Sequence, residues 1–515
     1  SNATGTAKIG PIPVSATITG SFIQERYLSH GTGSGSWYLL GTPFGGNNFT
    51  NFSNDFRVVG LSGGFGDQGS DILPSVEPER STILKYVESM HNVRTDTVQK
   101  SGWRIPSNEN MVAGTGYRVW VNYYSNHRHL FDTKGTLTRG AGVNNEFTFP
   151  PLTRNEYSNC YPTNPGVNPL NCSESNRGWN LIANPFPCDI DWDAAGGWTK
   201  PAELNNAFFT WNSAQGGYRA YVGAGGSSLG VTSNTELNPN LIPSGQSFFV
   251  RLTTPGTYVT NLSVKESAKV TTSSATFLRT ATASGSQLKI RLTSANVPGY
   301  QFDAMVKMEE GSTDGFDQNR DLEIFPGTNA EFSIRSEGNA GRLLESIAPI
   351  TETRTIGLSM DYHGRTGSFS LGFPEGEMFL ENTEVYLKDN HFGTLTLIQA
   401  GTEYSFAANS EGELNPIRFE LILNPASVTG GKNLVSRIAR LVYPNPVTNQ
   451  VFTLVCSGED TELDITDVLG RKVAFSMNQT VAGQKEVTFP SSVKAGQYWV
   501  KVRNSDGMTV HPVTV

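Results

Sequence analysis

Four carboxylates crowd one glycine-containing turn in the middle of the chain, in the run STDGFDQNRDLE. Calcium prefers hard oxygen ligands on a loop, but aspartate and asparagine in a turn also bond their own backbone. The sequence therefore leaves two interpretations, a structural calcium site and a self-bonded turn. The candidate ligands are Asp314, Asp317, Asp321 and Glu323.

Two further groups have the residue types of a metal site. The run CDIDWDAAGG places aspartates at alternate positions, as a calcium loop begins. Ala194 and Lys200 then stand where that loop needs glycine and glutamate, and Asp193 is equally suited to cap a helical turn. His127 and His129 would share one face if this run forms a strand, with Asp132 near, and the alternative is a polar strand end or hairpin.

Two catalytic motifs occur in contexts that do not support them. The G-x-S-x-G match at 226–230 lies in a glycine-rich loop, whereas a nucleophile elbow joins a strand to a helix. The G-x-G-x-x-G match at 64–69 is followed by prolines instead of a helix. We therefore expect no enzyme and no cofactor beyond structural calcium. A glycosidase or protease site that only folding assembles stays open as an alternative.

Tryptophan is unevenly distributed, because seven of the eight lie at or before Trp211. Indole rings exposed in a groove can stack on sugars, whereas indole rings on core strands fill the interior. Trp103, Trp192 and Trp198 stand in loop-rich sequence and are the candidates for glycan stacking.

Composition indicates a turn-rich β protein outside the cytoplasm. The 515 residues suggest three or four domains at ~100–200 residues each. Charged residues make up only 17% and glycine numbers 54, which is typical of β structure with many turns. The net charge of -8 and the lack of a basic run argue against nucleic-acid binding. No apolar stretch is long enough to span a membrane as a helix.

The chain begins with Ser-Asn-Ala, which looks like a tag-cleavage scar, and no signal peptide follows. Strand-like sequence starts at 14–23, so we expect the chain to be part of a longer protein. An export route permits disulfides, and we expect one between Cys160 and Cys172, which flank a Pro- and Asn-rich loop. Cys456 lies in an apolar strand and is expected to be a buried free thiol.

An internal repeat organises the first half. SWYLLGTPF at 36–44 matches GWNLIANPF at 178–186, an offset of 142 residues. NMVAGTGYRVWV at 110–121 matches NLIPSGQSFFVRL at 240–252, an offset of 131 residues counted from Gly114 to Gly245. Nearly equal offsets indicate duplication of a β unit of about 130 residues. Each unit pairs an aromatic strand that ends at proline with an apolar strand that follows a glycine turn.

Short strand candidates separated by turns then run from 268 to 427 and predict a β-sandwich. We therefore predict an all-β fold of β-sandwich modules in tandem. The expected parts are the tag scar and N-terminal segment at 1–19, repeat 1 at 20–140, repeat 2 at 141–267, the β-sandwich at 268–427, a linker at 428–440 and a C-terminal β domain at 441–515.

The C-terminal domain alternates apolar and polar residues in short runs broken by turns, and its prolines at 444 and 446 mark an edge strand. Three sequence blocks follow one another in this domain: YPNP at 443–446, D-x-x-G-R-x-V at 467–473 and A-G-x-Y-x-V-K-V at 495–502. In this order they resemble the C-terminal sorting domain of proteins that the type IX (Por) secretion system of Bacteroidetes exports. The chain departs from that family at its end, which is Pro-Val-Thr-Val instead of a basic residue. The block residues are Tyr443, Pro444, Asn445, Pro446, Asp467, Gly470, Arg471, Val473, Gly496, Tyr498, Val500, Lys501 and Val502.

The resemblance implies an immunoglobulin-like domain that the type IX machinery recognises and then removes, leaving the upstream part attached to the outer surface. The upstream regions resemble β modules of large Bacteroidetes surface proteins. We therefore expect an extracellular or outer-membrane surface protein that acts as an adhesin or scaffold and does not span the membrane, with a glycan or other surface ligand. The alternative is a carbohydrate-binding accessory region of a larger polysaccharide-degrading enzyme.

Overall fold

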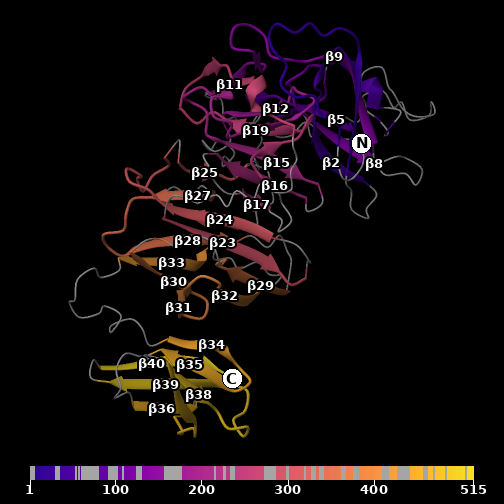
Figure 1. Cartoon of the computed structure of the whole chain (residues 1–515). Helices are drawn as coiled ribbons and strands as arrows, with labels where there is room; N and C mark the ends of the chain where they lie inside the picture. The colour runs from indigo at the N-terminus through magenta and orange to yellow at the C-terminus, as the bar shows by residue number, and fades with distance from the viewer. Residues whose placement is uncertain are drawn as a thin grey trace, which may run out of the picture. The chain divides into compact units, whose positions relative to one another are not determined.

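The computed structural model is built from β-strands, and its described residues include short 3-10 helices but no α-helix (Figure 1). This agrees with the predicted all-β class. The structure describes residues 6–515 except for 29–34, 53–54, 56–57, 59–80, 91–101, 107–109, 123–129, 156–176, 214–215, 224–227, 232–237, 272–285, 297–300, 318–319, 326–331, 336–340, 361–366, 375–379, 381, 409–416, 426–440, 456–461, 468–469, 482–483 and 505–506.

The chain divides into two compact units. Unit 1 comprises Ser1–Ala348, Ser359–Met378 and Glu403–Pro416, and unit 2 comprises Pro349–Leu358, Phe379–Thr402 and Ile417–Val515. Unit 1 therefore holds both sequence repeats together with part of the region that follows them. The module boundaries given above stay a prediction.

The first repeat forms a four-stranded antiparallel sheet in the order β2-β8-β5-β6. The other strands of this repeat form two smaller sheets, β1-β9-β3 and β4-β7. The strands are β1 (Phe22–Tyr27), β2 (Gly35–Leu40), β3 (Phe44–Gly45), β4 (Asn47–Asn48), β5 (Ile83–Tyr86), β6 (Trp103–Arg104), β7 (Asn110–Met111), β8 (Tyr117–Asn122) and β9 (Leu130–Leu137), with 3-10 turns η1 (Phe49–Phe52) and η3 (Glu88–Met90).

The second repeat has the same strand order, β12-β19-β15-β16. Its register is also the same, since Trp37 pairs with Trp120 and the counterpart Trp179 pairs with Arg251. The strands are β10 (Glu146–Thr148), β11 (Leu152–Arg154), β12 (Trp179–Ala183), β13 (Asp189–Asp191), β14 (Trp198–Thr199), β15 (Ala207–Asn212), β16 (Gly217–Val222), β17 (Ser228–Val231), β18 (Leu241–Ile242), β19 (Ser247–Arg251), β20 (Tyr258–Thr260), β21 (Ser263–Lys265) and β22 (Lys269–Val270), with η6 at Glu266–Ala268.

The two repeats contact each other reciprocally. The Gly41 amide donates to the Gly245 carbonyl at 2.8 Å, and the Ala183 amide donates to the Gly114 carbonyl at 3.0 Å. Ala183 is the counterpart of Gly41, and Gly245 is the counterpart of Gly114. One contact is thus made twice, as across a two-fold axis. The backbones approach so closely that a Cβ on Gly41 would lie 2.2 Å from the Ala183 Cβ.

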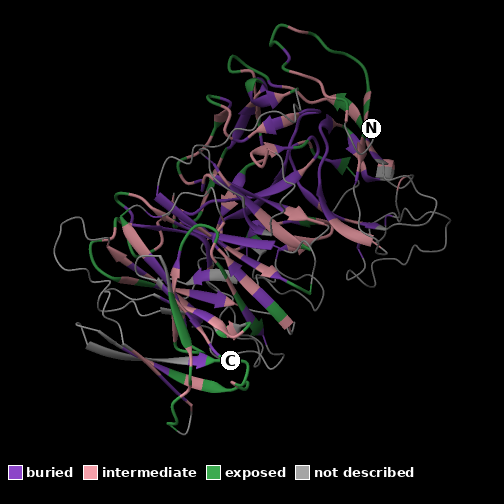
Figure 2. Cartoon of the chain, turned by 60° about the horizontal axis from the view of Figure 1, so that its bottom comes forward, coloured by how far each residue is buried: buried purple, intermediate pink, exposed green. Residues whose placement is uncertain are grey.

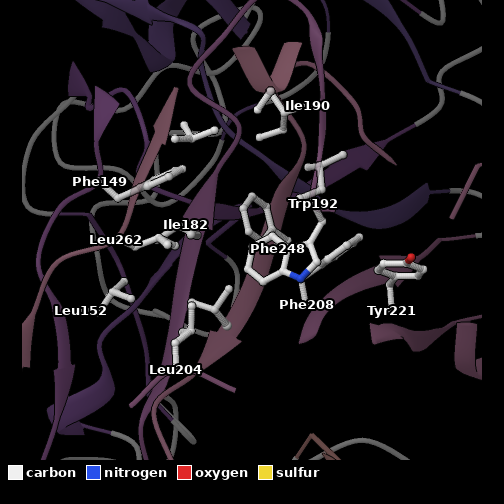
Figure 3. Packing of buried hydrophobic residues seen from close by; sticks show 14 of the residues in the cluster. Phe149, Leu152, Ile182, Ile190, Trp192, Leu204, Phe208, Tyr221, Phe248 and Leu262 are labelled. Carbon is white, nitrogen blue, oxygen red and sulfur yellow. The ribbon is translucent and has the colours of Figure 1, made fainter. Parts of the chain in front are cut away.

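Each repeat has its own hydrophobic core, and Figure 2 shows that buried residues follow the strands. The first core packs one face of β2, β5 and β8, with Ile83 and Val119 fully buried. The second core is rich in aromatic rings, and Figure 3 shows Trp192 among Phe208, Phe248 and Tyr221. Large aromatic side chains contribute much of the burial energy in such cores.

The sheet of the second repeat continues into the region that follows. Strand β17 pairs with β16 and also with β24, where Gly230 lies opposite Asp303. Within unit 1, β24 then pairs with β27, and β27 pairs with β26. Strand β23 pairs with both β24 and β29, and β29 pairs with β32. These strands are β23 (Ser286–Ser294), β24 (Gln301–Met308), β25 (Leu322–Glu323), β26 (Phe332–Arg335), β27 (Gly341–Ile347), β29 (Gly367–Gly372) and β32 (Glu403–Ala408).

Unit 2 contains a sheet in the order β28-β33-β30-β31 and the C-terminal domain. The C-terminal domain has two sheets, β34-β35-β38-β37 and β36-β39-β40, around a shared core. The strands are β28 (Arg354–Met360), β30 (Thr383–Asp389), β31 (Thr394–Ile398), β33 (Ile417–Pro425), β34 (Leu441–Thr448), β35 (Val451–Val455), β36 (Glu462–Asp467), β37 (Ser476–Val481), β38 (Gln484–Thr488), β39 (Gln497–Asn504) and β40 (Gly507–Thr514).

The contact between the repeats limits the size of the side chain that can stand at position 41. Gly41→Ala adds a methyl group where Ala183 already lies, so it should lower the free energy of unfolding by about 1–3 kcal/mol, as overpacking does. Gly41→Ala combined with Ala183→Gly moves the methyl group to the other side and should restore most of the loss. Denaturant unfolding followed by tryptophan fluorescence measures both effects.

Gly372→Ala is the matched control, because a Cβ there meets its nearest atoms only at 3.9 Å. Equal unfolding free energies for Gly41→Ala and Gly372→Ala would contradict the close approach. So would a double variant that is as unstable as Gly41→Ala alone.

Candidate functional site

The D-x-x-G-R block of the C-terminal domain forms a tight turn after β36. The Asp467 carboxylate accepts hydrogen bonds from the Arg471 amide at 2.9 Å and from Arg471 Nε at 2.7 Å. Gly470 has a φ of 78°, a conformation that glycine adopts without steric cost, and its amide donates to the Asp467 carbonyl at 2.9 Å. Each residue that defines the block therefore has a role in shaping the turn.

The turn presents cationic side chains to solvent. The Arg471 side chain is 74% exposed although it is paired with Asp467, and the Lys472 side chain is 81% exposed with its Nζ 3.3 Å from Asp464. The next residue, Val473, donates its amide to the Ile465 carbonyl and packs against the core. The turn is thus anchored at its base and open at its tip.

The A-G-x-Y-x-V-K-V block fixes the end of the chain. Gly496 and Val515 exchange two backbone hydrogen bonds, of 3.0 and 2.9 Å. Tyr498 packs its ring against Phe489 and donates its hydroxyl to the Lys494 carbonyl at 2.8 Å. Val500 and Val502 are fully buried in the core, whereas Lys501 lies between them on the strand and is half-buried. The alternation predicted from the sequence is therefore present in β39.

The Tyr-Pro-Asn-Pro block lies in β34, which is the edge strand of its sheet. The pairing of β34 with β35 loses register between Tyr443 and Thr448, the stretch that contains both prolines. Proline cannot donate to a sheet ladder, so this placement is the one expected for the block. Pro446 is exposed.

The acidic turn at 311–323 is held largely by its own backbone and by arginine. Asp317 accepts hydrogen bonds from the amide and hydroxyl of Thr313, at 2.6 and 2.9 Å. Asp321 accepts the Asp317 amide at 2.8 Å and the Ser346 amide at 2.7 Å. Asp314 is exposed, and Glu323 is paired with Arg251. The carboxylates of Asp317, Asp321 and Glu323 thus have partners other than a metal.

No group of three His, Cys, Asp or Glu side chains is placed to hold a metal ion within the described part of the chain. The calcium hypothesis for these four residues therefore stays a prediction without an assembled ligand set. The alternative named above, a self-bonded turn, accounts for the hydrogen bonds of Asp317 and Asp321.

Sequence reasoning missed the buried ion cluster beneath this turn. The Arg342 guanidinium contacts Asp321 Oδ2 at 3.0 Å and also Glu345, and the side chains of both acids have no exposed area. Two carboxylates thus share one guanidinium in the interior. Burial raises the pKa of Asp321 to about 6, although the Asp317 and Ser346 amides and Arg342 favour its charged form. The arginine lies 21 residues along the chain, so no local pattern indicates the pairing.

Two of the three candidate tryptophans, Trp192 and Trp198, do not lie as the glycan-stacking hypothesis requires. Trp192 was expected to be exposed, which is wrong, because its side chain is 1% exposed and lies in the second core. Trp198 is half-buried, stacks on Phe149 and donates its indole N–H to the Asp191 carbonyl at 2.7 Å. Trp103 is half-buried on β6. A loop that folds back on a sheet buries its aromatic residues, and loop-rich sequence does not show this.

The remaining candidate residues from the sequence lie partly outside the described residues and partly in strands or hydrogen-bonded turns. Cys160, Cys172, Cys456, the histidine pair at 127 and 129, and the G-x-G-x-x-G run lie outside the described residues. Within the G-x-S-x-G match, residues 226–227 lie outside the described residues, whereas 228–230 belong to β17, with Ser228 paired to Tyr221, instead of the loop that we expected. Asp191 and Asp193 accept hydrogen bonds from Asn240 and Tyr221.

The raised pKa of Asp321 predicts a pH dependence of stability. The folded state holds this proton more tightly than the unfolded chain, whose aspartate titrates near its ordinary value of about 4. The contribution of Asp321 to stability should therefore grow as the pH falls from about 6 to about 4. Relative to Asp321→Asn, the wild type should gain up to ~3 kcal/mol across that window.

Unfolding free energies of the two proteins at several pH values measure this difference. Asp314→Asn, at an exposed position of the same turn, is the matched control. A constant difference between wild type and Asp321→Asn from pH 4 to pH 7 would show that the Asp321 pKa is not raised.

Comparison with known proteins gives two family matches. Residues 441–515 match the family described as "Secretion system C-terminal sorting domain". This confirms the sorting domain that the three blocks predicted, at the same boundaries, and a type IX sorting domain directs export to the cell surface or the extracellular space. Among the described residues no helix has the length and apolar character needed to span a membrane.

No curated protein matches the chain. A solved structure titled "Biofilm associated protein - BSP domain" is similar over 100% of this chain and 97% of that one, with 9% sequence identity and a TM-score of 0.17. A TM-score of this size supports no inference about the present fold.

The other family match extends from residue 73 to residue 423, over the later part of the first repeat, the second repeat and the region after them. Because it covers more than half of the 515 residues and ends before the sorting domain begins, the chain belongs to the family described as "Domain of unknown function (DUF8693)".

Proposed function

We propose that this protein is a non-enzymatic adhesin or scaffold that the type IX machinery exports through residues 441–515 and leaves on the cell surface. The observation that carries the proposal is the sorting domain itself, a two-sheet β domain in which all three sequence blocks have defined structural roles. The upstream family has no function in its description, so the role of residues 73–423 is argued from their construction.

The upstream part is built as a continuous support. Strand β17 belongs to the second repeat and pairs directly with β24 of the following region. The buried pair of Arg251 and Glu323 and the bond from the Asn205 amide group to the Asp321 carbonyl at 3.0 Å join the same two regions. Continuous strand pairing with buried polar links favours a rigid stalk over hinged modules.

Its buried carboxylates are engaged in structure, which favours a passive role. Glu88 accepts the amides of Asn155 and Gly178. Glu266 accepts the Ile12 amide and is paired with Lys269 at 2.6 Å. A catalytic carboxylate instead needs access to a substrate proton or a reacting centre.

The exposed tip of the D-x-x-G-R turn is where we propose that the export machinery makes contact. Asp467 orients the Arg471 side chain while leaving most of it exposed, which is the arrangement of a preorganised contact residue. Lys472 is next to it and similarly exposed, and its Nζ lies 3.3 Å from a different carboxylate, that of Asp464.

Charge reversal at the two positions separates a specific contact from a general charge effect. In a host with a type IX system, Arg471→Glu should leave most of the full chain in the periplasm, because it removes the oriented guanidinium. Lys472→Glu should be exported like the wild type. Cell fractionation with immunoblotting of surface, periplasm and medium measures the distribution.

A chain that lacks residues 441–515 is the reference for complete loss of export. If that shortened chain reached the surface in normal amount, the proposed export route would be wrong. If Arg471→Glu and Lys472→Glu were exported equally well, the turn would not be the contact. Thermal unfolding of the purified full-length variants excludes misfolding as the cause.

A further inference from the structure

An arginine surrounded by three tryptophans lies where the two repeats meet. The Arg118 guanidinium carbon is 4.3 Å from the ring centroid of Trp37, 5.4 Å from that of Trp103 and 5.9 Å from that of Trp211. We call these four residues the Arg118 rim. They come from β8, β2, β6 and β15, so both repeats contribute to it.

The strand pattern places the rim on the face opposite the first core. Tyr38 and Val119 point into that core, so their neighbours Trp37 and Arg118 lie on the other face. The Ser213 hydroxyl donates to the Trp37 carbonyl at 2.7 Å and ties the β15–β16 hairpin to β2. The contact between the repeats therefore fixes the position of Trp211 relative to Trp37.

The rim is the open edge of an aromatic cluster. Trp103 packs on Phe249 at 5.9 Å and Trp211 packs on Tyr218 at 5.0 Å. Phe249 has no exposed area, whereas all four rim residues are partly exposed. The indole rings are thus supported from behind and reachable from solvent, as a stacking platform requires.

The charge of Arg118 is not compensated by a paired carboxylate, as the charges of three other arginines are. Arg251, Arg342 and Arg418 are each paired with a buried carboxylate, Glu323, Asp321 and Asp389 respectively. No carboxylate is paired with Arg118 within the part of the chain that the structure describes. Burial lowers its pKa, and the nearby Tyr218 only partly opposes this. An anion at the rim would relieve that cost.

The counterpart of the rim in the second repeat shows what covers such a face. By the repeat offsets, Trp37 corresponds to Trp179, and Arg251 occupies the position of Trp120. The Arg251 guanidinium lies 5.3 Å from the Trp179 ring, Glu323 neutralises it, and Phe325 packs on the ring at 4.8 Å. In the second repeat, a carboxylate and a flat apolar side chain of the same chain therefore cover the face that contains Trp179.

We propose that the Arg118 rim binds an acidic saccharide, with a sugar carboxylate on the Arg118 guanidinium and the C–H face of the ring on Trp103 or Trp211. Guanidinium pairs with carboxylate in a planar, two-bond geometry, and indole faces pack against apolar surfaces. This deepens the proposed surface role by naming a ligand class. Nucleic acid offers anions as well, but binding of a phosphate backbone needs several clustered cations, and the rim contains one arginine.

Binding to the purified full chain tests this independently of export. The probe is a galacturonic acid oligosaccharide, and its fully methyl-esterified form of the same length retains the rings without the charge. Isothermal titration should show binding of the acid form and at least about tenfold weaker binding of the ester, since a charge-assisted pair is lost. Equal affinity for both forms would overturn the proposal, as would no binding of the acid form.

Variants then locate the site. Arg118→Met should weaken binding of the acid form at least about tenfold, and Arg118→Lys should restore it only in part, because lysine lacks the planar fork. Trp103→Ala should also weaken binding. Trp499→Ala is the matched control, an exposed tryptophan of the sorting domain. Thermal unfolding identifies any variant that fails to fold, and the conservative Arg118→Lys keeps the test decisive in that case.

A second probe separates a saccharide site from a general carboxylate site. Poly-glutamate carries the same acid group without a sugar ring, and it should bind at least about tenfold more weakly than the acidic oligosaccharide if stacking contributes. Equal binding of poly-glutamate, or unchanged binding of the saccharide by Arg118→Met, would show that the rim does not recognise an acidic saccharide.

Discussion

The rest of unit 1 depends on the close backbone contact between its two repeats. The Gly41 and Ala183 backbones approach within a distance that leaves room for only one methyl group. Paired hydrogen bonds to Gly245 and Gly114 lock this arrangement from both sides. The contact fixes how the sheet of the first repeat is oriented against strands β12, β19, β15 and β16 of the second, and this orientation decides which aromatic faces become interior and which stay at an edge.

Much of this arrangement follows from the sequence. The repeated Trp-Leu-Leu and glycine-turn motifs contain both halves of the contact, and their period-two pattern sets the face of each side chain. Equivalent residues accordingly pair in the same register in both repeats. The sorting domain was equally readable, because its defining contacts are local, as between Asp467 and Arg471 four residues apart.

The parts that sequence reasoning missed all depend on partners that are distant in the chain. Asp321 was a candidate calcium ligand, but its charge is matched by Arg342 from another strand. Trp192 stands in loop-rich sequence, yet the loop folds back and places the ring against Phe248. The three tryptophans around Arg118 come from three strands of two repeats. Sequence periodicity and turn-forming residues describe neighbours along the chain, so they carry no information about contacts between residues that are distant in sequence.

Duplication explains why one molecule contains a sealed and an open version of the same face. In the second repeat, Glu323 and Phe325 of the following region neutralise Arg251 and cover Trp179, so that face serves as core. In the first repeat no carboxylate is paired with the arginine among the described residues, and that arginine stands at position 118, the counterpart of Phe249. A cationic, aromatic face is costly to leave uncovered, because burial disfavours the unpaired guanidinium. Its partial exposure in a protein exported to the surface is therefore best understood as room for a partner that supplies the missing carboxylate.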